Sequence, residues 1–139
     1  SSNDVIPTTI HVSAAIDCHQ QLLPAINHLI SVIDKKAESL ASVVTTGRTH
    51  LMDAMPVSLG QTLTGWATQL RNALTHIENT LPQIHQLAIG GTAVGTGINA
   101  DERFGGLVAE QLSNITGLSF SASKNYFAAL SSQDAAVAL

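Results

Sequence analysis

Apolar residues recur with helical spacing along two long tracts of the chain, and stretches that contain glycine and proline separate them. The first tract runs from about Pro7 to Val44, and Pro24 inside it predicts a kink or a new helix start. The second tract runs from Leu59 to about Leu87. An apolar stripe with this period predicts amphipathic helices, so we expect an all-α protein built around long helices.

Composition fits a helical domain of ordinary size rather than a disordered tail. Of the 139 residues, 45% are hydrophobic, 12% are charged and only 4% are aromatic. Small and aliphatic side chains therefore dominate, which favours closely packed helices. The formal net charge of −4 is spread along the chain without a basic patch, so no nucleic-acid partner is expected.

Three sequence features bear on compartment and partners. The chain contains no apolar run of roughly 18 residues, so no membrane partner is expected. Its first residues lack the basic-then-apolar pattern of a signal peptide. The single cysteine, Cys18, excludes an internal disulfide and a multi-cysteine metal site. We therefore expect a soluble, cytoplasmic protein, with a mitochondrial location as the alternative for a eukaryotic source.

Glycine and proline mark the stretches outside the long tracts. Residues 45–58 contain Gly47 and Pro56, which predict an irregular connection. The string GGTAVGTGIN at residues 90–99 predicts a loop, and shorter helical runs follow it. This string matches neither common phosphate-binding glycine pattern, so a tight turn between helices and a ligand-facing loop remain equal alternatives. The shorter helices are expected at residues 103–116 and 126–139, and a further kink at Pro82.

The two ends of the sequence predict a fragment. The last helical run stops at Leu139 without a glycine, an asparagine or a basic last turn to cap it. Ser1 to Asp4 stand directly before the first helical run. We therefore expect a chain truncated at both ends. A natural domain whose disordered ends fall outside the sequence is the alternative.

One of the six histidines differs from the rest in its setting. His50 lies in the irregular connection, next to Arg48 and Thr49 and shortly before Asp53. An imidazole that titrates near pH ~6.5 can donate or accept a proton at neutral pH. On these residues alone, a solvent-exposed loop histidine without a role is the more frequent alternative. The other five are expected to be polar residues on helices without a role: His11, His19, His28, His76 and His85.

Three strings in the chain resemble the fumarase and aspartase superfamily. GRTHLMDAMPVSLGQ at residues 47–61 resembles the second signature region of class II fumarases. SSNDVIPT at residues 1–8 is similar to the family's substrate-binding string, and GGTAVGTGIN resembles its glycine loop. Aspartases tend to carry glutamine where this chain has His50 and alanine where it has Gly91, so the resemblance is to fumarases.

The resemblance implies a fold and a reaction. Residues 1–139 are expected to be part of the central helical domain of a fumarase-like lyase, a long-helix bundle truncated at both ends. The implied reaction interconverts fumarate and L-malate by reversible addition of water, without a cofactor or a metal. An aspartate ammonia-lyase-like enzyme of the same superfamily and a non-catalytic helical oligomerisation module are the alternatives.

The resemblance also implies roles for individual residues. His50 is expected to be catalytic and to exchange a proton with the hydroxyl that leaves malate or the water that adds to fumarate. Ser1, Ser2, Asn3 and Thr49 are expected to bind the substrate by donating hydrogen bonds to a carboxylate. Fixed donors of this kind would stabilise the charge that develops there during the elimination.

Other implications limit what this chain can do alone. The family's catalytic-serine loop, G-S-S-x-M-P-x-K-x-N, does not occur in the 139 residues, so the isolated chain is expected to be inactive. Met52 and Met55 depart from the usual fumarase string. The family builds each site from three subunits of a homotetramer, which implies that Asn3 lies far from His50 within one chain. We therefore expect self-association through the exposed apolar faces of the long helices.

Overall fold

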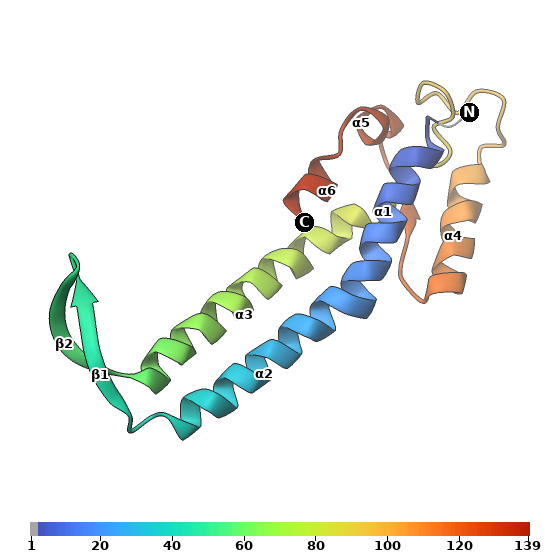
Figure 1. The fold of residues 1–139 in the computed structure, drawn as a ribbon. Coiled ribbons are helices and arrows are strands. Elements are labelled where there is room, and N and C mark those ends of the chain that lie inside the picture. The colour runs from blue at the N-terminus through green and yellow to red at the C-terminus, as the bar shows by residue number, and fades with distance from the viewer. Residues whose placement is uncertain (1–2) are drawn as a thin grey trace. The chain divides into compact units, whose positions relative to one another are not determined.

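A computed structural model of the chain describes residues 3–139, and helices form most of it (Figure 1). The all-α prediction is therefore confirmed for the bulk of the fold, although four short strands are also present. The chain divides into two compact units. The first contains the residues up to Gln21 together with Ile77–Leu139, and the second contains Leu22–His76.

The first unit combines helices with a short parallel strand pair. Strand β3 pairs with β4 in the register Gln86↔Ser121 and Leu87↔Ala122. The elements that lie mainly in this unit are α1 (Val5–Asp17), the π-helical turn η1 (Cys18–Leu22), β3 (Gln86–Leu87), α4 (Phe104–Thr116), β4 (Ser121–Ala122), α5 (Tyr126–Ser131) and α6 (Asp134–Ala138).

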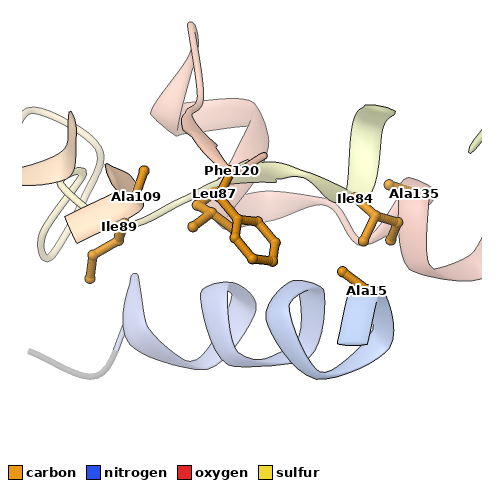
Figure 2. Close-up of a cluster of buried hydrophobic side chains, with 7 residues drawn as sticks. All are labelled: Ala15, Ile84, Leu87, Ile89, Ala109, Phe120 and Ala135. Carbon is orange, nitrogen blue, oxygen red and sulfur yellow. The ribbon is translucent and has the colours of Figure 1, made fainter. Parts of the chain in front are cut away.

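Small and aliphatic side chains form the core of the first unit. Figure 2 shows one cluster with members from α1, from β3 and the residues beside it, and from α4 and α6. Ile84 and Leu87 are the largest fully buried side chains, and burial of such a side chain contributes about 1.5–3 kcal/mol. Ala15 on α1 is also fully buried. Its small side chain lets α1 lie close to the segment that carries Leu87.

The two prolines of the long tracts occupy different places in their helices. Pro24 is the second residue of α2 (Leu23–Ser39), which directly follows the π-helical turn η1. Proline removes a donor and crowds the carbonyl four residues earlier, and a π-helical turn is a local adjustment that relieves this conflict. Pro82 lies inside α3 (Leu59–Ile84), which continues to Ile84. The predicted kink or new helix start at Pro24 is therefore confirmed, because α2 begins at Leu23, whereas no new helix starts at Pro82.

The prediction of an irregular connection at residues 45–58 is wrong. This segment is an antiparallel β-hairpin, in which β1 (Val44–Thr49) pairs with β2 (Met52–Ser58). The register shifts between Thr46 and Arg48, so Gly47 sits at a β-bulge. A Cβ at Gly47 would lie 2.5 Å from the carbonyl oxygen of Met55, which explains the glycine. The predicted helix therefore ends at Ser39 rather than near Val44.

Hydrogen bonds at the start of α3 join it to the hairpin and to the end of α2. Ser58 Oγ accepts from the Gln61 N–H at 3.0 Å, and Gln61 Oε1 accepts from the Ser58 N–H at 2.9 Å. This is a reciprocal capping box. The Gly60 N–H donates to the Leu40 carbonyl at 3.2 Å. The string S-L-G-Q thus fixes where β2 ends and α3 begins.

The end of the chain also differs from the prediction. The helix expected over residues 126–139 is two short helices, because Ser132 between α5 and α6 has extended backbone angles. Asn125 caps α5 by accepting a hydrogen bond from the Ala128 N–H at 3.1 Å. The helix predicted for residues 103–116 is confirmed as α4, and Gly117 ends it with a φ of 74°.

A stacked pair of histidines lies in the first unit. The ring centroids of His19 and His85 are 5.5 Å apart with an interplanar angle of 20°, and the His85 ring meets Phe120 edge-on at 5.4 Å. The Nε2 atoms of both histidines are buried without a hydrogen-bond partner among the described residues. Burial lowers the pKa of His85, and the charge of His19 lowers that pKa further.

Acid is expected to weaken the first unit through His85. The unfolded imidazole titrates near pH ~6.5, whereas the pKa of folded His85 is lower, so the folded state binds fewer protons. The stability that neutral His85 contributes is therefore present above about pH 6.5 and is lost as the pH falls below it. In thermal unfolding between pH ~7.5 and ~5.5, His85→Gln should lose less stability than the wild type. His28→Gln, at an exposed histidine, should lose as much stability over this pH range as the wild type does. If all three proteins lose the same stability, His85 does not have this effect.

Two neighbouring glycines in α4 are expected to respond oppositely to alanine. A Cβ at Gly105 would lie 2.5 Å from the Ile89 carbonyl oxygen and from the Tyr126 hydroxyl, so Gly105→Ala should cost about 1–3 kcal/mol of unfolding free energy. A Cβ at Gly106 meets nothing within 4 Å, so Gly106→Ala should be neutral or stabilising by up to about 1 kcal/mol. Denaturant unfolding of both variants measures the two changes in unfolding free energy. Equal changes for Gly105→Ala and Gly106→Ala would contradict the prediction.

Candidate functional site

His50 lies at the tip of the β-hairpin in the second unit. Thr49 ends β1 and pairs with Met52 at the start of β2, so His50 and Leu51 form a two-residue turn. Their φ values are 48° and 61°. Positive φ at both central residues is the type I′ pattern, which usually takes asparagine and glycine. Histidine and leucine pay about 1–2 kcal/mol each to adopt it, so the turn is strained.

The hairpin tip is open to solvent within this chain. Thr49 and His50 are both exposed, and Leu51 is 97% exposed. Arg48 and Asp53 face each other across the strands, with their side chains 3.8 Å apart and both more than two-thirds exposed. An ion pair this exposed contributes little to stability. The tip therefore presents the Thr49 and His50 side chains outward to solvent.

Of the predicted substrate-binding residues at the start of the chain, Asn3 belongs to the first unit. Ser1 and Ser2 lie outside the described residues. Asn3 is exposed, and its side-chain Nδ2 donates a hydrogen bond to the carbonyl of Ala93 in the glycine loop. Thr49 and His50 belong to the second unit. The separation of Asn3 from His50 within one chain stays a prediction.

Asp4 is a residue of the site region that the sequence did not single out. It is only 4% exposed, and its Oδ2 accepts hydrogen bonds from the N–H of Gly90 at 3.2 Å and of Thr92 at 2.9 Å. Its carbonyl accepts from Thr8 Oγ1 at 2.6 Å. The string at residues 3–8 and the glycine loop are therefore in direct contact. A carboxylate that precedes a helix gives no sequence signal of such a distant partner.

Packing accounts for glycines of the loop at residues 90–99. A Cβ at Gly91 would lie 2.9 Å from the Tyr126 Cβ, and a Cβ at Gly95 would lie 3.0 Å from the Phe127 ring. Gly95 also has a φ of 101°, which side chains rarely adopt. Of the two alternatives for this loop, these contacts favour the tight structural turn.

Two grooves lie near these elements, one in each unit. A groove of about 490 Å³ in the first unit is bordered by Asn3, by apolar residues of α1 and by Leu130 and Gln133. A groove of about 720 Å³ in the second unit lies between the end of α2, the base of the hairpin and the start of α3. The second groove contains neither Thr49 nor His50, so its size alone does not make it the site.

The remaining predictions concern Cys18, metal binding and membrane-spanning helices. Cys18 is buried, and burial raises the pKa of its thiol, with a further contribution from Asp17, as fits a core residue. Within residues 3–139, no group of three or more His, Cys, Asp or Glu side chains is placed to hold a metal ion. In the same part of the chain, no helix is both long and apolar enough to cross a membrane.

Known sequences similar to this chain are lyases. The profile of a family described as "Lyase" matches residues 1–139. "Fumarate hydratase class II 2" of Pseudomonas aeruginosa is 55% identical over 138 residues, which cover 99% of this chain and 30% of that protein. "Fumarate hydratase class II" of Thermus aquaticus is 49% identical over 134 residues, or 96% of this chain and 29% of that protein. This chain thus spans about 30% of the length of these relatives.

Solved structures agree with the sequence matches. The class II fumarase of Schistosoma mansoni superposes with a TM-score of 0.89 at 39% identity, over 97% of this chain and 31% of that one. A fumarate lyase:delta crystallin of Brucella melitensis, in a structure bound to cobalt, gives a TM-score of 0.88 at 33% identity, over 97% of this chain and 29% of that one. The chain therefore belongs to the lyase family, and it is similar to class II fumarases of that family.

Proposed function

We propose that the protein containing this chain is a fumarate hydratase, which interconverts fumarate and L-malate by reversible addition of water. The observation that carries the proposal is the 55% identity, across 99% of the chain, to a protein named as a class II fumarate hydratase. The string around His50 supports the same choice, because it resembles fumarases rather than aspartases at this histidine.

His50 is the proposed catalytic residue. An imidazole can take a proton from an attacking water or give one to a leaving hydroxyl at neutral pH. Its place at the tip of a strained, exposed turn suits a group that is delivered to a site formed elsewhere. Thr49 precedes it and is proposed to donate a hydrogen bond to a substrate carboxylate. Ser1, Ser2 and Asn3 are proposed to do the same.

The proposed chemistry needs fixed donors around one carboxylate. Removing the carbon-bound proton of malate leaves a carbanion whose charge spreads onto the neighbouring carboxylate. Hydroxyl and amide donors held in place stabilise that charge without reorganising during the reaction. Side chains supply these roles in the proposal, and no cofactor or metal is assigned one. The catalytic serine of the family's mobile loop is not among the 139 residues, so we propose that the isolated chain is inactive.

A homo-oligomer, in the family a homotetramer, is the proposed working state. Large apolar side chains of the second unit are exposed on the long helices, including Leu29 at 46%, Val32 at 49% and Trp66 at 55%. Exposed apolar side chains grouped on helices favour association with further helices. The open tip that carries His50 also lacks a surrounding site of its own. Both features support assembly through the long helices.

We propose a cytoplasmic enzyme of the tricarboxylic acid cycle, with a mitochondrial location as the alternative for a eukaryotic source. The bacterial origin of the similar proteins from Pseudomonas aeruginosa and Thermus aquaticus supports the cytoplasmic choice. The net charge of −4, spread along the chain without a basic patch, argues against nucleic acid as a partner. No membrane partner is proposed.

Turnover of L-malate tests the proposed reaction. The full-length protein should convert L-malate to fumarate, followed by the rise in ultraviolet absorbance of fumarate, and should not release ammonia from aspartate. The isolated 139-residue chain should show no activity in the same assay. Turnover of aspartate in place of malate would contradict the choice of fumarase. Activity of the isolated chain would contradict only its proposed inactivity.

Replacing His50 tests its proposed role. His50→Asn keeps a residue that tolerates positive φ in a type I′ turn but removes the group that exchanges the proton. In the full-length protein kcat should fall by about 100-fold to 10,000-fold, the usual contribution of a general acid or base. His28→Asn, at an exposed histidine of α2, should keep the wild-type kcat. Equal kcat values for His50→Asn and the wild type would exclude a catalytic His50.

A further inference from the structure

We propose that Asp4 is a positioning residue that orients the Asn3 side chain through the glycine loop, residues 90–99. This inference rests on the proposed function, in which Asn3 binds a substrate carboxylate. It adds that the glycine loop and Asp4 hold Asn3 in the orientation in which it binds the substrate. Neither Asp4 nor the loop contacts the substrate in this proposal.

The Asp4 carboxylate holds one end of the loop. A single oxygen, Oδ2, accepts from the N–H of Gly90 at 3.2 Å and of Thr92 at 2.9 Å. Asp4 is 4% exposed, so water competes little for these bonds. Bonds from N–H groups to an ionised carboxylate are about twice as strong as neutral ones. Gly90 and Thr92 both have positive φ, at 105° and 59°, and the anchor holds the backbone in this unusual conformation.

The anchored backbone also fixes the position of the Ala93 carbonyl, which accepts a hydrogen bond from the Asn3 side chain. Ala93 directly follows Thr92, so fixing the Thr92 N–H also restricts the Ala93 carbonyl. That carbonyl can only accept a hydrogen bond, and Asn3 Nδ2 donates to it. The amide nitrogen of Asn3 is thereby turned toward the loop. Since Asn3 and Asp4 are adjacent in sequence, the contacts close a small ring with few remaining degrees of freedom.

The far side of the loop is held as well. The N–H groups of Gly95 and Gly97 both donate to the Gly91 carbonyl, at 2.9 Å and 3.2 Å. Gly91 and Gly95 lie so close to Tyr126 and Phe127 that a Cβ at either would meet those residues at 3.0 Å or less. The loop therefore has little freedom to move away from Asn3. A donor held in advance binds a carboxylate without first losing side-chain freedom.

A double-mutant cycle in the full-length protein tests whether Asp4 acts through Asn3. Asp4→Ala and Asn3→Ala should each lower kcat/KM for L-malate by about tenfold or more, as loss of a charge-assisted hydrogen bond does. In the Asn3→Ala background, Asp4→Ala should lower kcat/KM by less than about twofold further, because coupled residues are not additive. Multiplicative effects of the two changes would overturn the proposal, and so would wild-type kcat/KM in Asp4→Ala.

Two further variants separate positioning from general stability. Asp17→Ala removes the exposed aspartate at the last residue of α1, the helix that Asp4 precedes, and should keep the wild-type kcat/KM. Asp4→Asn keeps an oxygen acceptor without the charge and should recover part of the kcat/KM lost in Asp4→Ala. If Asp4→Ala does not fold, Asp4→Asn takes its place in the cycle. A kcat/KM for Asp4→Asn no better than that of a foldable Asp4→Ala would contradict the positioning role.

Hydrogen exchange distinguishes failure of this inference from failure of the proposed function. In Asp4→Asn, the backbone amides of residues 88–99 should exchange faster than in the wild type, whether or not the protein acts on malate. Unchanged exchange would overturn the anchoring role of Asp4. An inactive wild-type enzyme with faster exchange in the variant would instead contradict the fumarate hydratase proposal and, with it, the role of the anchor in catalysis.

Discussion

Both units depend on main-chain segments that approach one another more closely than a side chain would allow. A Cβ at Gly60 would lie 2.7 Å from the Ala37 carbonyl oxygen, and a Cβ at Gly105 would lie 2.5 Å from that of Ile89. Glycine at these positions lets α3 start against the end of α2, and lets α4 start against the segment that leads into the glycine loop. The elements that carry the proposed site residues are thus placed largely by backbone contacts, which tolerate little adjustment.

Helical periodicity predicted that the long helices exist, although α2 ends at Ser39 rather than near Val44 and α3 ends at Ile84. It located α4 to within one residue at its start, and Gly117 marked its end. The hairpin was missed because Gly47 and Pro56 suggested an irregular loop, although the β-branched run Val43 to Thr46 favours a strand. The bulge at Gly47 and the small size of the sheet explain how a strand pair accommodates both residues.

The candidate site could be predicted only as separate strings. The resemblance selected Thr49 and His50. No periodicity in the sequence indicates that His50 lies in a two-residue turn with positive φ, or that Thr49 directly precedes this turn. Asp4 escaped notice because its partners lie 86 and 88 residues further along the chain. Such a contact depends on how α1 and the loop pack, which local sequence does not encode. Resemblance therefore points to chemical groups, whereas the groups that support them emerge only from the fold.

The hairpin that carries His50 has two outer edges. Within residues 3–139 the sheet contains only β1 and β2, so each strand has a row of main-chain groups without a neighbouring strand in that sheet. A sheet of two strands is marginally stable in water when nothing covers it. The turn that carries His50, the proposed catalytic residue, therefore sits on a sheet of two strands only. In the proposed homo-oligomer, a neighbouring chain that covers the hairpin would also order this turn, so the geometry around His50 would report on assembly as well as on sequence.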